Sequence, residues 1–90
     1  MNATQREQLR ISLLRFLGDA PTMAQNLGML TQLAVSEGRR GLLQQEVETE
    51  LQYLVDKGLA TLAPKTLSPE NKAWRITATG RDQLAESQGL

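Results

Sequence analysis

The chain has 90 residues, enough for one domain with one small core, and 40% of its residues are hydrophobic while 22% are charged, as in folded globular proteins. It contains no cysteine and no histidine, which excludes disulfides, thiolate nucleophiles and the commonest zinc ligands, so we expect no enzyme, no metal and no cofactor. Ten basic and ten acidic residues give a net charge of zero, which excludes a general attraction to nucleic acid.

The first seven residues are polar, unlike a signal peptide, and no apolar run reaches the roughly 18 residues that a membrane span needs. No internal repeat or low-complexity tract divides the chain. We therefore expect a cytoplasmic protein with a single domain over residues 1–90 and no contact with a membrane.

The first predicted helix runs from about residue 4 to residue 17. Thr4, with Glu7 three residues later, has the form of a capping box at its start. Ile11 and Leu14 point away from the predicted core face, which indicates a second packing partner, either the C-terminal helix of the same chain or a second copy in a homodimer. The core face itself consists of Leu9, Leu13, Phe16 and Leu17.

A second helix is predicted after a break at residues 18–21, where glycine and proline end the first one. Thr22 to Ala24 is a candidate for a short strand. Asn26 is the expected N-cap of the second helix, which should end at Gly38. Its apolar residues recur at steps of three and four: Leu27, Leu30, Leu33 and Ala34.

A third helix is predicted over about residues 42–57, after a turn formed by Arg39, Arg40 and Gly41. Gly41 is the expected cap at its start, and Gly58 should supply a left-handed C-cap. Two helices joined by a short turn that contains glycine are typical of a helix-turn-helix, in which the later helix enters a DNA groove. The predicted inner face of the third helix consists of Leu43, Val47, Leu51 and Leu54.

A β-hairpin should follow the third helix. Its strand candidates cover residues 59–63 and 73–77, and a loop with a proline near each end, at about residues 64–72, joins them. Because side chains alternate along a strand, Trp74 and Ile76 should face the core while Arg75 faces outward.

The last predicted helix is capped by Thr77 and carries Leu84. The elements then follow in the order α-(β)-α-α-β-β-α. This order predicts a mainly α fold with a small β-hairpin wing, a winged helix-turn-helix, whose commonest use is DNA recognition.

Short stretches of sequence support this fold by resemblance. Residues 54–59, followed by the hairpin and residues 76–81, resemble winged-helix regulators of the ArsR, MarR and PadR type. A closer resemblance, over about residues 11–87, is to the small winged-helix proteins encoded in Mu-like phages and prophages, and it implies a fold and a phage or bacterial setting more than an activity. It rests on Leu14-Arg15-Phe16-Leu17, Ala20-Pro21, Asn26, Leu30, Gly38, Thr49-Glu50-Leu51, Leu54, Lys57-Gly58-Leu59-Ala60-Thr61, and Thr77 with Gly80.

The outer face of the third helix is the predicted DNA-reading surface. Four residues should turn outward: Gln45, Thr49, Gln52 and Asp56. On this face glutamine can pair with adenine, and threonine can contact a base edge or the thymine methyl group. An ordinary solvated helix face has the same residue types, so this alternative stays open. The cations expected to contact phosphates are Arg39 and Arg40 in the turn and Lys65, Lys72 and Arg75 on the wing.

Four carboxylates and no cation lie between residues 42 and 56, and near a duplex they would repel phosphates. They are Glu46, Glu48, Glu50 and Asp56. Glu50 lies close to the apolar face and is expected to be held by an arginine, with Arg75 as one candidate. Two hypotheses follow: a small transcriptional regulator that binds double-stranded DNA as a dimer, and a protein-interaction module that uses the acidic helix or a patch formed by Ile11 and Leu14.

Overall fold

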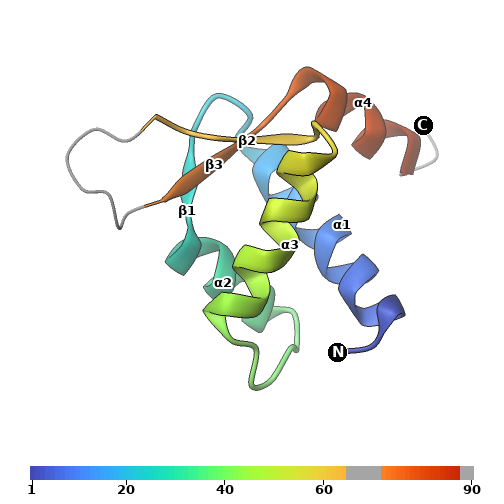
Figure 1. Cartoon of the computed structure of the whole chain (residues 1–90), viewed down its shortest axis with the longest axis vertical. Helices are drawn as coiled ribbons and strands as arrows, with labels where there is room; N and C mark the ends of the chain where they lie inside the picture. The colour runs from blue at the N-terminus through green and yellow to red at the C-terminus, as the bar shows by residue number, and fades with distance from the viewer. Residues whose placement is uncertain (65–71, 88–90) are drawn as a thin grey trace.

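The structure is a computed structural model that describes residues 1–64 and 72–87. Within these residues the chain forms four helices and a three-stranded antiparallel sheet with the strand order β1-β3-β2 (Figure 1). The elements are α1 Ala3–Asp19, β1 Gln25–Asn26, α2 Leu27–Ser36, α3 Gln44–Asp56, β2 Ala60–Leu62, β3 Ala73–Ile76 and α4 Ala78–Ser87. The predicted order of elements and the mainly helical class are confirmed.

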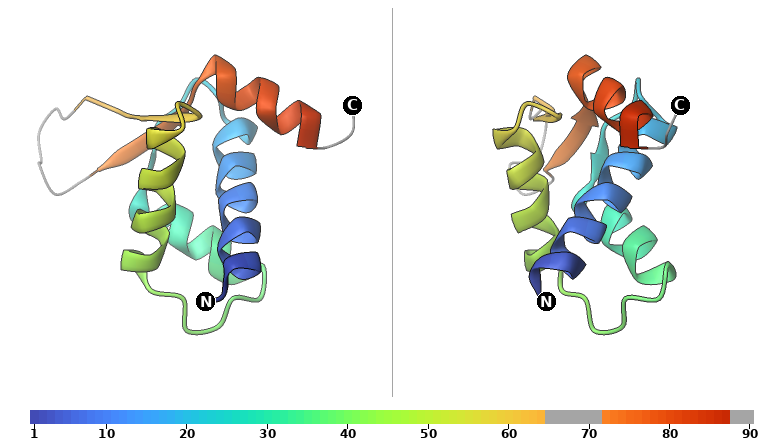
Figure 2. Two further views of the ribbon diagram at one scale, coloured as in Figure 1. Left: turned by 45° about the vertical axis from the view of Figure 1, so that its right-hand side comes forward. Right: turned by 90° about the vertical axis from the view of Figure 1, so that its right-hand side faces the viewer.

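Helix α1 is the centre of the packing, because it contacts α2, α3, α4 and β3. It runs beside α3, while α4 lies across its C-terminal end and the β2–β3 hairpin extends away from the helices (Figure 2).

No helix in residues 1–64 or 72–87 has the length and apolar character needed to cross a bilayer.

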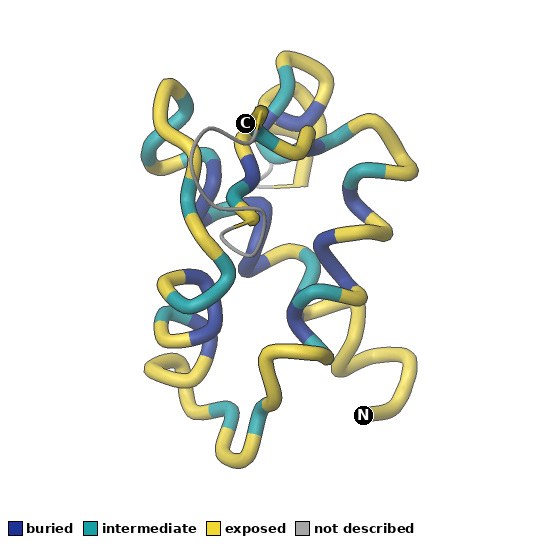
Figure 3. Tube along the Cα trace, turned by 60° about the vertical axis from the view of Figure 1, so that its left-hand side comes forward, coloured by how far each residue is buried: buried dark blue, intermediate teal, exposed yellow. Residues whose placement is uncertain are grey.

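The core lies between the helices and one face of the sheet, where buried residues of α1, α2, α3, β2 and β3 gather and the partly buried Leu84 of α4 packs against them (Figure 3). Burial of one leucine side chain stabilises a fold by about 1.5–3 kcal/mol, so these residues hold the elements together. Trp74 and Ile76 face inward and Arg75 is exposed, as predicted. The buried apolar residues are Leu9, Leu13, Leu14, Phe16, Leu17, Leu30, Ala34, Val47, Leu51, Leu54, Ala60, Trp74 and Ile76.

The start of α1 differs from the prediction. Asn2, not Thr4, is the N-cap: its side-chain oxygen accepts a hydrogen bond from the Gln5 N–H at 2.8 Å. The Gln5 side chain accepts the Asn2 N–H in return at 3.0 Å. The capping box therefore exists, but an asparagine and a glutamine form it two residues earlier, and Glu7 takes no part in it.

The second apolar side of α1 packs within the chain. Leu14 is only 4% exposed, whereas Ile11 is 43% exposed. Helix α1 packs against the C-terminal helix α4, as predicted. The prediction that Ile11 and Leu14 together form an exposed contact patch is wrong, because Leu14 is buried and only Ile11 is exposed.

Strand β1 lies at Gln25–Asn26, so the prediction of a strand at Thr22 to Ala24 is wrong. Its two residues pair with Trp74 and Ala73 of β3. Pairing with β3, and not the local sequence pattern, defines this strand. The Gln25 amide also donates to the Phe16 carbonyl at 2.7 Å and so ties the strand to α1.

Asn26 both ends β1 and caps α2, accepting the Met29 N–H at 2.8 Å, as predicted. Helix α2 ends at Ser36, two residues before the predicted end at Gly38. Gly38 has a φ of 103°, a left-handed conformation that glycine adopts without strain, and it belongs to the turn that follows.

Helix α3 begins at Gln44, with Leu43 and not Gly41 as its N-cap residue. A leucine side chain cannot accept a hydrogen bond, so Glu46 caps the helix by accepting the Leu43 N–H at 3.0 Å. As a cap residue Leu43 is 60% exposed, and its predicted place in the core is wrong; Leu42 packs there instead. At the other end, Gly58 has a φ of 76°, which confirms the left-handed C-cap.

Helix α4 begins where predicted, because Thr77 accepts the Gly80 N–H at 2.9 Å and donates its own hydroxyl to the Gly58 carbonyl at 2.7 Å. Gly80 itself is buried against the backbone of Leu59. Thr77 therefore fixes the end of the hairpin and the start of α4 to the end of α3.

Candidate nucleic-acid interface

The outer face of α3 carries Gln45, Thr49 and Gln52, and all three are exposed, as predicted. The Thr49 hydroxyl donates to the Gln45 carbonyl at 2.9 Å, and the Gln52 amide donates to the Asp56 carboxylate at 2.9 Å. The threonine hydroxyl and both glutamine side chains keep further donors or acceptors for a ligand. The face therefore offers three neutral hydrogen-bonding side chains and the carboxylate of Asp56 to solvent.

All four carboxylates of α3 have partners inside the chain, and that of Asp56 is the Gln52 amide. Glu46 caps its own helix, as described above. Glu48 forms an ion pair with Lys72 at 2.9 Å, and Glu50 forms one with Arg10 at 2.7 Å. Two of the four negative charges of α3 are therefore matched by cations, one from α1 and one from the residue preceding β3.

The Arg10–Glu50 pair is the most buried of the ion pairs, with side-chain exposures of 27% and 6%. The guanidinium of Arg10 lies 3.8 Å from the centre of the Tyr53 ring, and the Lys57 ammonium lies 5.6 Å from that centre. Glu50 is held by an arginine, as expected, but Arg10 and not Arg75 supplies it. Sequence reasoning missed this partner because Arg10 lies 40 residues away in the chain.

A shallow groove runs along α3 on the side that faces α1. Arg6 and Arg10 line it from α1. The lining residues from α3 are Gln45, Glu48, Thr49, Glu50, Gln52, Tyr53 and Asp56. Neither arginine was among the predicted site residues. The available signal was their four-residue spacing, which places both on one side of α1.

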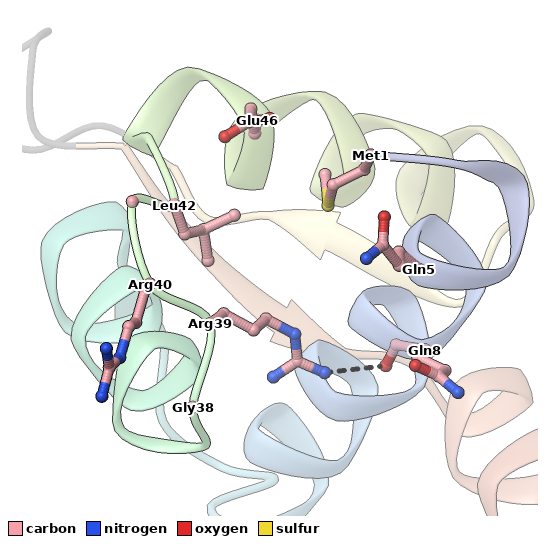
Figure 4. Close-up of a pocket in the computed structure, with 9 residues that line it drawn as sticks. Met1, Gln5, Gln8, Gly38, Arg39, Arg40, Leu42 and Glu46 are labelled. Carbon is pink, nitrogen blue, oxygen red and sulfur yellow. Dashed lines mark hydrogen bonds between the residues drawn. The ribbon is translucent and has the colours of Figure 1, made fainter.

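Arg39 turns toward α1 and is occupied by contacts within the chain. Its guanidinium donates to Glu37 at 2.8 Å and to the Ser12 hydroxyl at 2.9 Å. It also donates to the Gln8 carbonyl at 3.4 Å (Figure 4). Arg40 is exposed and points away from Arg39 and α1 (Figure 4). Of the two arginines in the turn, only Arg40 has its charged group directed to solvent.

Glu37 is the acceptor at the centre of this contact between the turn and α1. The hydrogen bond from Arg39 lowers the pKa of the Glu37 carboxyl, and the Ser12 hydroxyl and the charge of Arg15 act in the same direction, while partial burial opposes them. Arg15 also forms an ion pair with Glu37. The carboxylate form of Glu37 is therefore favoured in the folded protein.

The remaining predicted cations lie on or beside the hairpin. Lys72 is exposed and reaches across to Glu48 of α3. Arg75 is exposed on β3, opposite Thr61 of β2. Lys65 lies outside the described residues. The structure thus places Gln45, Thr49 and Gln52 on one helix face, with Lys72 tied to that helix.

Comparison of the chain with protein-family models and with curated proteins found no match. A functional assignment therefore depends on the geometry of α3 and of the groups around it.

Proposed function

We propose that the chain is a non-enzymatic winged-helix protein that binds double-stranded DNA, and that it serves as a small transcriptional regulator of phage or bacterial origin. In this proposal α2, the turn and α3 form the helix-turn-helix, and the β2–β3 hairpin is the wing. The order of the elements and the antiparallel pairing of β3 with both other strands support it.

One observation carries the proposal: the outer face of α3 exposes Gln45, Thr49 and Gln52, while two of the four acidic residues of that helix are paired with cations and a third caps the helix. Asp56 stays exposed on this face as the partner of Gln52. Glu50 is buried behind Arg10, and Glu48 is paired with Lys72. The repulsion that four unpaired carboxylates would exert on phosphates is thereby reduced. Gln45, Thr49 and Gln52 remain available to read base edges in the major groove.

Phosphate contacts in this proposal come from exposed cations beside α3, namely Arg40 in the turn and Lys72 and Arg75 on the hairpin. Arg39 has a different role, because its guanidinium holds the turn against α1. With so few cations and a net charge of zero, we expect affinity to fall only shallowly with salt and to depend strongly on base contacts.

The test is a binding titration with a mixed-sequence duplex and with the DNA that flanks the protein's own gene. We expect tighter binding to the flanking DNA, and Gln52→Ala should lose about 1–3 kcal/mol of that preference, because a bidentate contact to adenine contributes about that much discrimination. Gln83→Ala, at an exposed position of α4, is the matched control and should change nothing. Absence of binding to any duplex at low salt would reject the proposal.

A second candidate function is a protein-interaction module, and a different surface favours it. Met23 and Met29 are 63% and 50% exposed, and they border a hollow lined by Phe16 and Leu33. Exposed apolar surface of this kind marks many protein contacts, and methionine adapts to varied partners. Met29→Lys should abolish capture of a specific protein partner and leave DNA binding intact.

A further inference from the structure

We infer that α1 supplies a second phosphate-binding element, in which Arg6 and Arg10 hold one backbone phosphate of the duplex beside Thr49 of α3. The inference rests on the proposed DNA binding and assigns to it two residues outside the helix-turn-helix and the wing. The observation behind this inference is that neighbouring groups fix the side chain of Arg10.

The guanidinium group of Arg10 is held at one edge by a hydrogen bond and on one face by an aromatic ring. Its Nε atom donates to Glu50 at 2.7 Å, and its guanidinium plane lies over the Tyr53 ring at 3.8 Å. Its two terminal nitrogens make no hydrogen bond to the part of the chain that the structure describes. A guanidinium whose plane is already fixed loses little side-chain entropy when it binds phosphate oxygens, and its paired N–H groups match them in geometry.

Arg6 supplies the charge that Arg10 lacks. Glu50 formally neutralises the charge of Arg10. The Glu50 side chain is only 6% exposed and lies behind the arginine. Arg6, one turn earlier on the same side of α1, is exposed and forms no ion pair within residues 1–64 and 72–87. A phosphate in the groove would thus meet one oriented donor and one unpaired cation. The carboxylates that also line the groove are Glu48, paired with Lys72, Glu50, paired with Arg10, and Asp56, which accepts the Gln52 amide.

The position of the groove fits a contact with the DNA backbone. Both arginines line it next to Thr49 and Gln52, on the α1 side of α3. Lys72 reaches Glu48 of the same helix from the hairpin. The major groove is about 12 Å wide and a phosphate backbone borders it on each side, so cations from two different elements beside one helix can fix the register of that helix.

The experiment measures affinity for a mixed-sequence duplex as a function of salt concentration. Each phosphate contact contributes about 0.9 to the slope of log affinity against log salt, so Arg6→Ala should lower the slope by about 1 and weaken binding at every sequence. The matched control is Arg81→Ala, which removes the same exposed charge from α4 and should leave the slope unchanged.

Two further variants separate the geometry of Arg10 from its charge. Arg10→Lys keeps a cation for Glu50 but removes the planar fork, and Tyr53→Leu removes the ring under the guanidinium. Both should weaken binding several-fold while the salt slope stays close to that of the original protein, and thermal unfolding followed by circular dichroism verifies that they fold. If Arg10→Lys does not fold, the salt slope measured for Arg6→Ala still tests the inference, because the Arg6 side chain is exposed.

The outcomes distinguish the two proposals. If the original protein binds DNA and Arg6→Ala retains its slope and affinity, the inference about α1 is overturned while the DNA-binding function stands. If the original protein binds no duplex at low salt, both are overturned.

Discussion

At the scale of single residues, Glu37 links three parts of the fold. Its carboxylate accepts hydrogen bonds from Ser12 and Arg15 of α1 and from Arg39 of the turn. The same arginine also donates to the Ala34 carbonyl near the end of α2 at 3.3 Å. One carboxylate therefore fixes how the turn between α2 and α3 sits against α1.

This arrangement predicts a loss of stability in acid. The folded pKa of Glu37 is lowered, chiefly by Arg39, so its contribution is fully present above the unfolded pKa of about 4.3 and is lost as the pH falls through the folded value. Because the pair is partly exposed, we expect a loss of about 0.5–1 kcal/mol. Urea unfolding between pH 7 and pH 3 measures it.

Glu37→Gln is the control for that prediction, since it removes the titrating group and keeps the shape of the side chain. The difference in unfolding free energy between the original protein and this variant should shrink as the pH is lowered. A difference that stays constant from pH 7 to pH 3 would show that Glu37 contributes nothing through its charge.

Prediction from sequence succeeded at single residues where the cause is local. The cap at Asn26 and the left-handed Gly58 follow from neighbouring residues. The partner of Glu50 could not be found in this way, because the fold alone brings Arg10 to α3. The same applies to the groove formed with Arg6.

At the scale of elements, Gly80 determines how closely α4 approaches the end of α3. A Cβ atom at this position would lie 2.1 Å from the Leu59 carbonyl oxygen, and a backbone atom cannot rotate away. We therefore expect Gly80→Ala to lower the unfolding free energy by about 2–4 kcal/mol, at the upper end for overpacking. Urea unfolding measures the loss.

Gly28→Ala provides the matched comparison in α2. The nearest atom to a Cβ there is the Asn26 side-chain oxygen at 3.5 Å, an ordinary contact distance. Replacement of a helical glycine that has room should stabilise the protein by about 0.5–1 kcal/mol. Equal effects of the two substitutions would contradict the packing described for α4.

The elements themselves were largely predictable, because spacings of three and four mark the helices and alternation marks β3. Strand β1 was misplaced since its two residues carry no pattern of their own and are defined by pairing with β3. The predicted inward position of Leu43 failed for a related reason: helical spacing does not show where a helix begins.

At the scale of the whole molecule, the burial of Leu14 bears on self-association. A stable interface needs about 800 Å² of surface from each partner, and a single half-exposed Ile11 cannot supply it. We therefore expect Ile11→Lys to leave the mass in sedimentation equilibrium unchanged. A shift from dimer to monomer in this variant would show that the exposed side of α1 does form a contact between copies.

The strand order β1-β3-β2 also has a consequence for how the chain reaches its folded state. The central strand comes last of the three in sequence, so β1 cannot pair until residues 73–76 have formed β3. Loops that close over many residues are slow to form, whereas helices form locally within microseconds. We expect α1, α2 and α3 to associate first, and the docking of β3 to be the late step that completes the sheet.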